Sequence, residues 1–144
     1  MTRTVLIADD NEEIREAFQR LLKTIPNVTV IAAACDGQEA VRIALADRPS
    51  VVLMDLSMPR LDGFEATRLI RVNAPDVRVI VVTADMSAAV VQKSFAAGAD
   101  GFVAKVAAAD ELPHALKALA CGERFTSPRV VQPTAGRITD QAQP

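Results

Sequence analysis

The sequence of 144 residues contains neither tryptophan nor tyrosine, and aromatic residues make up only 3% of it. Hydrophobic residues nevertheless make up 50%, so a folded core has to be built mainly from valine, isoleucine, leucine and alanine. A chain of this length suits one domain that can bury a sizeable core. The sequence therefore predicts a single domain with an aliphatic interior.

The sequence also has only a small net charge and contains few cysteines and histidines. The formal net charge is −2, which gives the chain no excess of positive charge with which to grip nucleic acid by itself. Cys35 and Cys121 lack the spacing of a metal site, and we interpret them as reduced, partly buried thiols. His114 is the only histidine and is expected on the surface of a helix.

Long apolar runs and targeting signals are missing as well. No apolar stretch reaches the length that crosses a bilayer. Residues 1–4 lead directly into a short apolar run that ends in acidic residues, which is not the pattern of a secretory signal peptide. The sequence therefore predicts a cytoplasmic protein without membrane contact.

Strand and helix patterns alternate five times along the chain. Short apolar runs rich in β-branched residues indicate buried strands at 5–8, 28–34, 51–54, 77–82 and 101–104. Helical periodicity follows at 11–24, 38–47, 64–73, 87–97 and 110–121. We expect Asp10 or Asn11 to cap the first helix and Asp110 to cap the last. This alternation predicts an α/β fold, a doubly wound five-stranded parallel sheet with helices on both faces.

The alternation stops near residue 122. The stretch 126–144 contains three prolines and few large apolar residues, without a sustained period. We therefore expect residues 1–122 to form the domain and residues 123–144 to form a flexible tail or linker.

Carboxylates stand directly after two of the predicted strands. Asp9 and Asp10 follow the first strand, and Asp55 follows the third. The carboxyl ends of parallel strands meet at one edge of the sheet, where ligands bind, and three carboxylates gathered there favour a bound cation. The pattern predicts a Mg²⁺ site with Asp9, Asp10 and Asp55 as oxygen ligands, and Asp55 as the best candidate nucleophile.

Two further polar residues end neighbouring strands. Thr83 follows the fourth strand and Lys105 follows the fifth. A hydroxyl donor and a positive charge are the groups that hold an oxyanion such as a phosphoryl group. Each residue alone would have an ordinary structural role, but their arrival at the same edge favours a functional site.

Four segments carry this pattern in order: Leu-Ile-Ala-Asp-Asp-Asn at 6–11, Leu-Met-Asp-Leu-Ser-Met-Pro-Arg-Leu-Asp-Gly at 53–63, Val-Thr-Ala at 82–84, and Ala-Gly-Ala-Asp-Gly-Phe-Val-Ala-Lys at 97–105. Together they resemble the receiver domain of two-component response regulators. The resemblance covers about residues 3–122 and implies a flavodoxin-like (CheY-like) (βα)5 fold with strand order 2-1-3-4-5. The stretch 119–128 resembles receivers of the NarL/LuxR (FixJ) subfamily, which carry a helix-turn-helix DNA-binding domain downstream.

The resemblance implies a role for each acidic residue. Asp55 would accept a phosphoryl group from a sensor histidine kinase. Asp10 would bind Mg²⁺ directly, Asp9 directly or through water, and the backbone carbonyl of Ser57 would be a further ligand. The Ser57 side chain lies where family members tune the lifetime of the phosphate.

The same resemblance implies a switch. Thr83 and Lys105 would contact the phosphoryl oxygens, and Phe102 would swing into the space that Thr83 leaves as it moves toward the phosphate. Asp85 and the small Ala84 lie at further positions that tune the chemistry. The chain would be a signalling phosphoacceptor that catalyses its own phosphorylation and dephosphorylation, not a metabolic enzyme.

One position departs from the family pattern. Many receivers follow the lysine with a proline in a cis peptide, but Val106 follows Lys105 here. A cis peptide before a residue other than proline costs about 2.5–4 kcal/mol. The charge of Lys105 is therefore retained, while the loop that follows it is free to differ from the family geometry.

The resemblance also implies partners and leaves alternatives. A phosphorylated receiver would form a homodimer, through the face of the fourth helix, fifth strand and fifth helix or through that of the first and fifth helices, and would contact DNA only through a C-terminal domain absent from this sequence. A natural stand-alone receiver and an unphosphorylated docking module are the alternatives. A haloacid-dehalogenase-type Mg²⁺ phosphohydrolase is disfavoured, because Ser57 stands where that class has a second aspartate.

Overall fold

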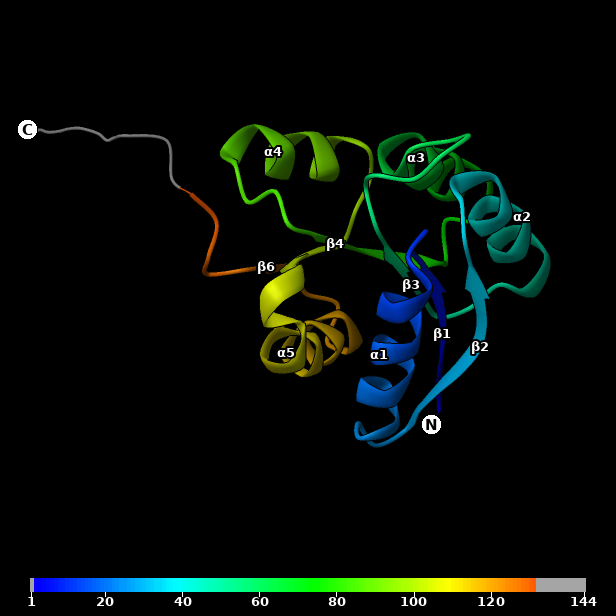
Figure 1. Ribbon diagram of the computed structural model, residues 1–144, viewed down its shortest axis with the longest axis horizontal. Helices are drawn as coiled ribbons and strands as arrows, with labels where there is room; N and C mark the ends of the chain where they lie inside the picture. The colour runs from blue at the N-terminus through cyan, green and yellow to red at the C-terminus, as the bar shows by residue number, and fades with distance from the viewer. Residues whose placement is uncertain (1, 132–144) are drawn as a thin grey trace, which may run out of the picture.

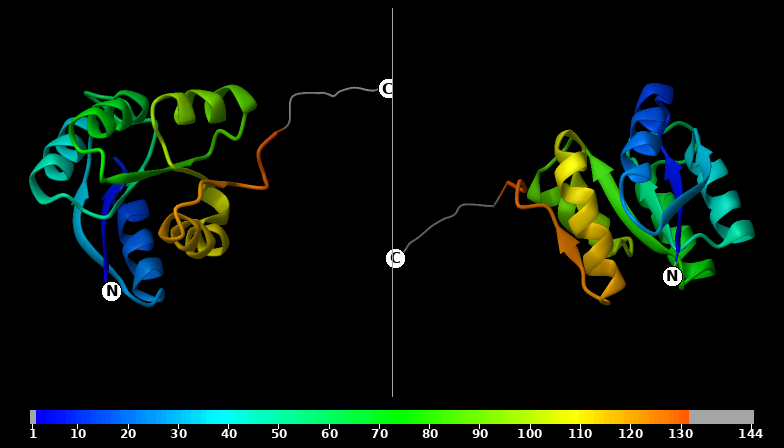
Figure 2. Two further views of the ribbon diagram at one scale, coloured as in Figure 1. Left: turned by 180° about the vertical axis from the view of Figure 1, so that it is seen from behind. Right: turned by 90° about the horizontal axis from the view of Figure 1, so that it is seen from below.

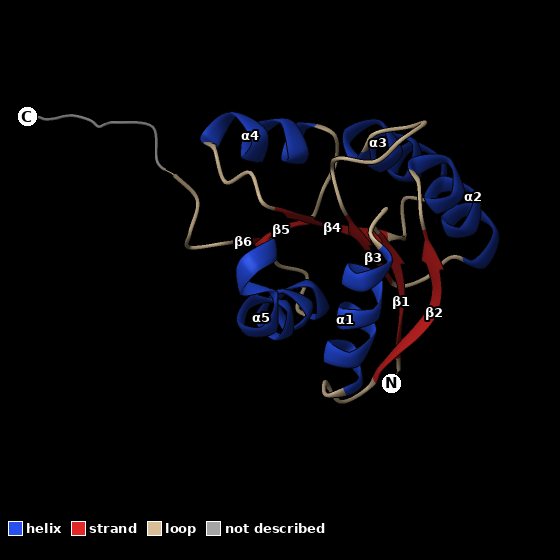
Figure 3. Ribbon diagram, viewed as in Figure 1, coloured by secondary structure: helices blue, strands red, loops and turns tan. Residues whose placement is uncertain are grey.

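The computed structural model describes residues 2–131, which form a single parallel sheet with the strand order β2-β1-β3-β4-β5-β6. Figures 1 and 3 show the sheet between two layers of helices. The strands are β1 (Arg3–Ala8), β2 (Val28–Ala34), β3 (Val51–Met54), β4 (Arg78–Thr83), β5 (Gly101–Ala104) and β6 (Phe125–Thr126). The α-helices are α1 (Glu12–Lys23), α2 (Gly37–Asp47), α3 (Gly63–Asn73), α4 (Ala88–Ala96) and α5 (Ala108–Ala120), with a 3₁₀ turn, η1, at Lys105–Ala107.

The core lies on both faces of the sheet. Helices α1 and α5 cover one face, and α2, α3 and α4 cover the other (Figures 1 and 2). Because side chains alternate along a strand, Val5 and Ile7 of β1 pack into the layer under α1 and α5, while Leu6 and Ala8 pack into the layer under α2 and α3. This two-sided burial explains why the strands read as continuous apolar runs.

The predicted strand order is confirmed for β1 to β5, and the sheet has one strand more than expected. Phe125 and Thr126 pair in parallel with Gly101 and Phe102 of β5. A strand of two residues is too short to show a period in the sequence. Part of the expected linker is therefore attached to the domain, while residues 132–144 of that linker lie outside the described residues.

The caps of two helices differ in outcome. Asn11 caps α1, its side chain accepting a hydrogen bond from the Ile14 N–H at 3.1 Å. The prediction that Asp110 caps the last helix is wrong, because η1 runs directly into α5 and the helix begins two residues earlier. Asp110 lies instead in the first turn, where a negative charge still favours the helix dipole.

Three surface expectations have mixed outcomes. Cys35 and Cys121 are free and exposed, so the expectation of partly buried thiols is wrong. His114 is exposed on α5, as expected. Among residues 2–131, none of the helices combines the length and the apolar character that a bilayer span demands.

Candidate functional site

The sheet brings three carboxylates together at the carboxyl ends of β1 and β3. The Asp9 N–H donates to the Ala34 carbonyl at 3.1 Å, and the Asp55 N–H donates to the Ala8 carbonyl at 2.9 Å, so both residues continue the strand pairing. One carboxylate oxygen from each of Asp9, Asp10 and Asp55 lies within 4.8 Å of the others. Asp9 is 1% exposed and Asp55 is 7% exposed, whereas Asp10 is open to solvent.

Asp9 is held by two hydrogen bonds, and its second carboxylate oxygen faces a lysine ammonium group. Its Oδ1 accepts from the Asn11 N–H at 2.9 Å, and its carbonyl accepts from Arg15 Nη1 at 2.7 Å. The buried Oδ2 lacks a hydrogen bond among the described residues and forms an ion pair with Lys105 Nζ at 2.9 Å. A buried carboxylate oxygen that lies next to two other carboxylates and already contacts a positive charge is a suitable ligand for a hard divalent cation.

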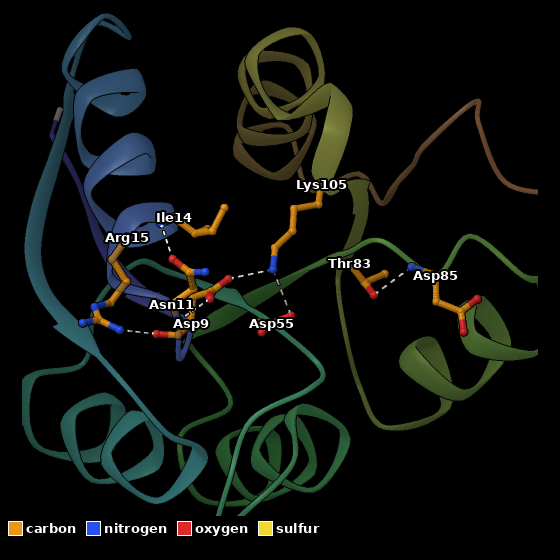
Figure 4. A network of polar contacts seen from close by, with 8 residues as sticks. All are labelled: Asp9, Asn11, Ile14, Arg15, Asp55, Thr83, Asp85 and Lys105. Atoms are coloured by element: carbon orange, nitrogen blue, oxygen red, sulfur yellow. Dashed lines mark hydrogen bonds and ion pairs between the residues drawn. The ribbon is translucent and has the colours of Figure 1, made fainter.

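Lys105 reaches the acids from the opposite side (Figure 4). Its Nζ lies 2.9 Å from Asp9 Oδ2 and 3.4 Å from Asp55 Oδ1. Residues 2–131 contain no cis peptide, so the bond to Val106 is trans, and the lysine still enters the site. Burial lowers the pKa of the Lys105 ammonium, but its interactions with Asp9 and Asp55 outweigh burial and hold that pKa above its ordinary value.

The electrostatics of Asp55 oppose its ionisation. Burial is the main reason that the pKa of the Asp55 carboxyl is raised above its ordinary value of 3.8, and the charge of Asp9 adds to the effect. Lys105 lowers the pKa of Asp55 but only partly compensates. A cation bound between the carboxylates would remove this repulsion, which makes the acidic cluster a fitting site for a divalent metal.

Thr83 borders the same site but faces a different partner. Its buried hydroxyl oxygen accepts a hydrogen bond from the Asp85 N–H at 3.2 Å (Figure 4). An open cavity of about 520 Å³ lies over these groups. It is lined by Asp9, Asp10, Asn11, Ile14, Asp55, Ser57, Thr83, Ala84, Asp85 and Lys105. Every candidate site residue from the sequence lines this cavity except Phe102.

Phe102 lies behind the site in the interior. It is fully buried and packs in a cluster with Leu56, Val81 and Ala99, against which Val130 is also packed. The expected strand order 2-1-3-4-5 places Phe102 on the edge strand, but β6 pairs with β5 and removes Phe102 from the edge of the sheet. Phe102 pairs with Val81, two residues before Thr83 on β4, and does not line the cavity.

Two residues that support the site were not recognised from the sequence. Gly63 begins α3 against the backbone of Asp55, and a Cβ atom at this glycine would lie 2.3 Å from the Asp55 carbonyl oxygen. Glu111 is 5% exposed and accepts a hydrogen bond from the Ala104 N–H at 3.0 Å. Neither contact has a sequence signal, because both depend on how the backbone turns between a strand and the helix that follows it.

Comparison with known proteins agrees with this geometry. Residues 5–117 match the response regulator receiver domain. The chain belongs to this family. Receiver domains are signalling modules of two-component systems, so the predicted signalling role and the flavodoxin-like fold are confirmed.

Three relatives show how far the similarity extends. The receiver is 34% identical over 131 residues to the response regulator GacA of Pseudomonas aeruginosa, covering 91% of this chain and 61% of GacA. It also resembles a LuxR-family response regulator from Aurantimonas sp. SI85-9A1, with 36% identity, a TM-score of 0.86, and coverage of 90% and 93% of the two chains.

The third relative is RcsB, solved as two dimers bound to two parallel DNAs. The match has 28% identity and a TM-score of 0.83, and it covers 90% of this chain and 66% of RcsB. The chain thus spans about 61% of the length of a curated relative such as GacA. These matches agree with the NarL/LuxR resemblance noted in the sequence.

Proposed function

We propose that Asp55 is the phosphoacceptor of this receiver and takes a phosphoryl group from a sensor histidine kinase. A carboxylate oxygen of Asp55 forms the bond to phosphorus while the bond between phosphorus and the donor nitrogen breaks. The observation that carries the proposal is the gathering of three carboxylates within 4.8 Å beside the ammonium of Lys105. A nucleophilic acid, a cation site and a positive charge together suit phosphoryl transfer.

The acidic cluster is proposed to hold Mg²⁺ through Asp9, Asp10 and Asp55, with the backbone carbonyl of Ser57 as a further ligand. The ion supplies positive charge that offsets the carboxylates and the incoming phosphoryl oxygens. Lys105 supplies a second positive charge, already held at the site by its ion pairs with Asp9 and Asp55. The protein's own groups therefore fix the orientation of Asp55 before the donor arrives.

Thr83 and Phe102 are proposed to convert phosphorylation into a change of conformation. Thr83 would donate its hydroxyl to a phosphoryl oxygen, and the movement of its side chain toward Asp55 would release the hydrogen bond that it accepts from the Asp85 N–H. Phe102 would then adjust to the space that Thr83 leaves. Three further residues line the cavity: Ser57, Ala84 and Asp85. We propose that they control the access of the attacking water and so tune the lifetime of the phosphate.

The output is proposed to be transcriptional. Phosphorylation would favour a homodimer of a cytoplasmic response regulator, which would contact DNA through a helix-turn-helix domain beyond this sequence. The similarity to GacA and to RcsB, whose dimers were solved on DNA, supports this proposal. The receiver would also catalyse its own dephosphorylation.

Intact mass after incubation with acetyl phosphate tests the central step. We expect one phosphoryl adduct on the wild-type chain in Mg²⁺, and none on Asp55→Asn or after EDTA is added. Asp76→Asn, which alters an exposed acid away from the cavity, is the control and should keep the adduct. A folded wild-type protein that forms no adduct would instead be a docking module, and turnover of phosphate esters would point to a phosphohydrolase.

A further inference from the structure

The segment after α5 pairs with the edge of β5 that β4 leaves free, and three further hydrogen bonds attach it to the domain. We call residues 125–131 the C-terminal strap, and Figure 2 shows its first part, β6, beside α5. The Ser127 N–H donates to the Phe102 carbonyl at 2.8 Å, and the Ser127 hydroxyl donates to Glu111 Oε2 at 2.9 Å. Farther along, the Val131 N–H donates to the Met86 carbonyl at 2.9 Å.

Each of these three anchors is connected to a site residue, along the chain or through a hydrogen bond. Phe102 is itself the proposed switch aromatic. Met86 lies three residues after Thr83, in the loop that includes Asp85. Glu111 accepts the Ala104 N–H through its other oxygen, Oε1, at 3.0 Å, immediately before Lys105.

The strap is also packed, so it is part of the folded domain. Ser127 is only 3% exposed, and Val130 packs against the buried cluster that contains Phe102. Arg129 Nε lies 3.7 Å from Glu111 Oε2, which adds an ion pair to the same carboxylate. Buried hydrogen bonds to a carboxylate are costly to leave unmade, so the strap has a defined docked position.

We infer that the C-terminal strap is a latch that docks on the unphosphorylated arrangement of the site and loosens when Asp55 is phosphorylated. This inference rests on the proposed function of Asp55. When Thr83 gives up the Asp85 N–H, the loop that presents the Met86 carbonyl loses its tie to the end of β4, and the anchor for Val131 moves with it. The strap thereby responds to the state of the cavity.

Thermodynamic linkage also predicts how strap docking affects phosphorylation. If phosphorylation weakens strap docking, then weakening the strap has to favour phosphorylation by the same factor. Couplings of this kind commonly amount to about 5-fold or more. Release of the strap should therefore favour the phosphorylated receiver, and faster phosphorylation or slower dephosphorylation would each raise its steady-state fraction in acetyl phosphate.

Val131 offers a matched pair of variants for the test. Its side chain is 63% exposed, so Val131→Pro removes the N–H donor to Met86 with little loss of packing, and Val131→Ala keeps that donor. At a concentration of acetyl phosphate that phosphorylates only a small part of the wild type, we expect the ratio of phosphorylated to unphosphorylated chain to be about 5-fold higher for Val131→Pro. Val131→Ala should match the wild type.

A variant at Ser127 and a measurement of amide hydrogen exchange test the latch independently of Val131→Pro. Ser127→Ala should act in the same direction as Val131→Pro, and the exposed Thr126→Ala is its control. In the wild type, amide hydrogen exchange at Val131 should become several-fold faster on phosphorylation. Thermal unfolding checks that each variant is folded.

The outcomes separate the two proposals. If the wild type forms the adduct while Val131→Pro and Val131→Ala accumulate it equally and Val131 exchange does not change, the latch is overturned and the phosphoacceptor stands. If the folded wild type forms no adduct, the proposed function is overturned and the latch with it. A selective effect of Val131→Pro and Ser127→Ala supports the latch.

Discussion

The Asp55 carboxylate stands in an environment that resists its charge. It is buried, it faces Asp9, and the ammonium of Lys105 at 3.4 Å compensates only in part, so its pKa is raised. A carboxyl with a raised pKa makes folding less favourable at every pH where the unfolded chain has already lost the proton. The proposed phosphoacceptor is therefore kept at some cost to stability.

Asp55→Asn should stabilise the metal-free protein. We expect its thermal midpoint at about pH 7 to exceed that of the wild type by about 3–6 °C, which corresponds to about 1 kcal/mol. The difference should shrink as the pH falls toward the ordinary value of 3.8, because Asp55 is then protonated in both folded and unfolded chains. Calorimetry in EDTA measures it, and a midpoint below that of the wild type would contradict the argument.

At the scale of the element, the start of α3 sets the position of Asp55. Asp62 caps this helix by accepting the Glu65 N–H at 2.9 Å, and the Gly63 N–H donates to the Leu56 carbonyl at 3.0 Å. Only glycine permits such a close approach, because the atoms that a Cβ would meet belong to the backbone of Asp55 and Leu56. The start of α3 and the segment after β3 that carries Asp55 are therefore packed backbone against backbone.

Gly63→Ala should disturb both folding and the site. The added methyl group forces the backbone of Asp55 away, which we expect to lower the free energy of unfolding by about 1–3 kcal/mol and to slow phosphorylation from acetyl phosphate. Urea titration and intact mass measure the two effects. Gln92→Ala, at an exposed position of α4, should change neither, and a wild-type rate for Gly63→Ala would argue against this role.

The positions of the strand ends could be predicted from the sequence, whereas the contacts of α5 could not. The runs at β1, β3 and β5 end in Asp9, Asp55 and Lys105, and parallel strands have to deliver these residues to one edge, so the site followed from the strands alone. The burial of Glu111 could not follow, because its partner Ser127 belongs to a segment without periodicity. The early start of α5 was also hidden, since η1 carries no sequence signal.

At the scale of the whole molecule, a cation at the acidic cluster should stabilise the fold. A ligand that binds only the folded state raises stability with its concentration. We expect about 10 mM Mg²⁺ to raise the thermal midpoint of the wild type by about 2–5 °C, and to raise those of Asp10→Asn and Asp55→Asn much less. Asp76→Asn should respond like the wild type, and equal shifts in all variants would indicate a general salt effect.

The two edge strands of the described sheet, β2 and β6, differ in length. An unpaired strand edge is a template on which another chain can add a strand and begin to aggregate. On one side the margin is β6, a strand of only two residues that is closely followed by Pro128, which has no N–H to offer. On the other side the margin is the seven residues of β2, with Ile31 exposed. A second chain is therefore expected to add a strand at β2 and not at β6.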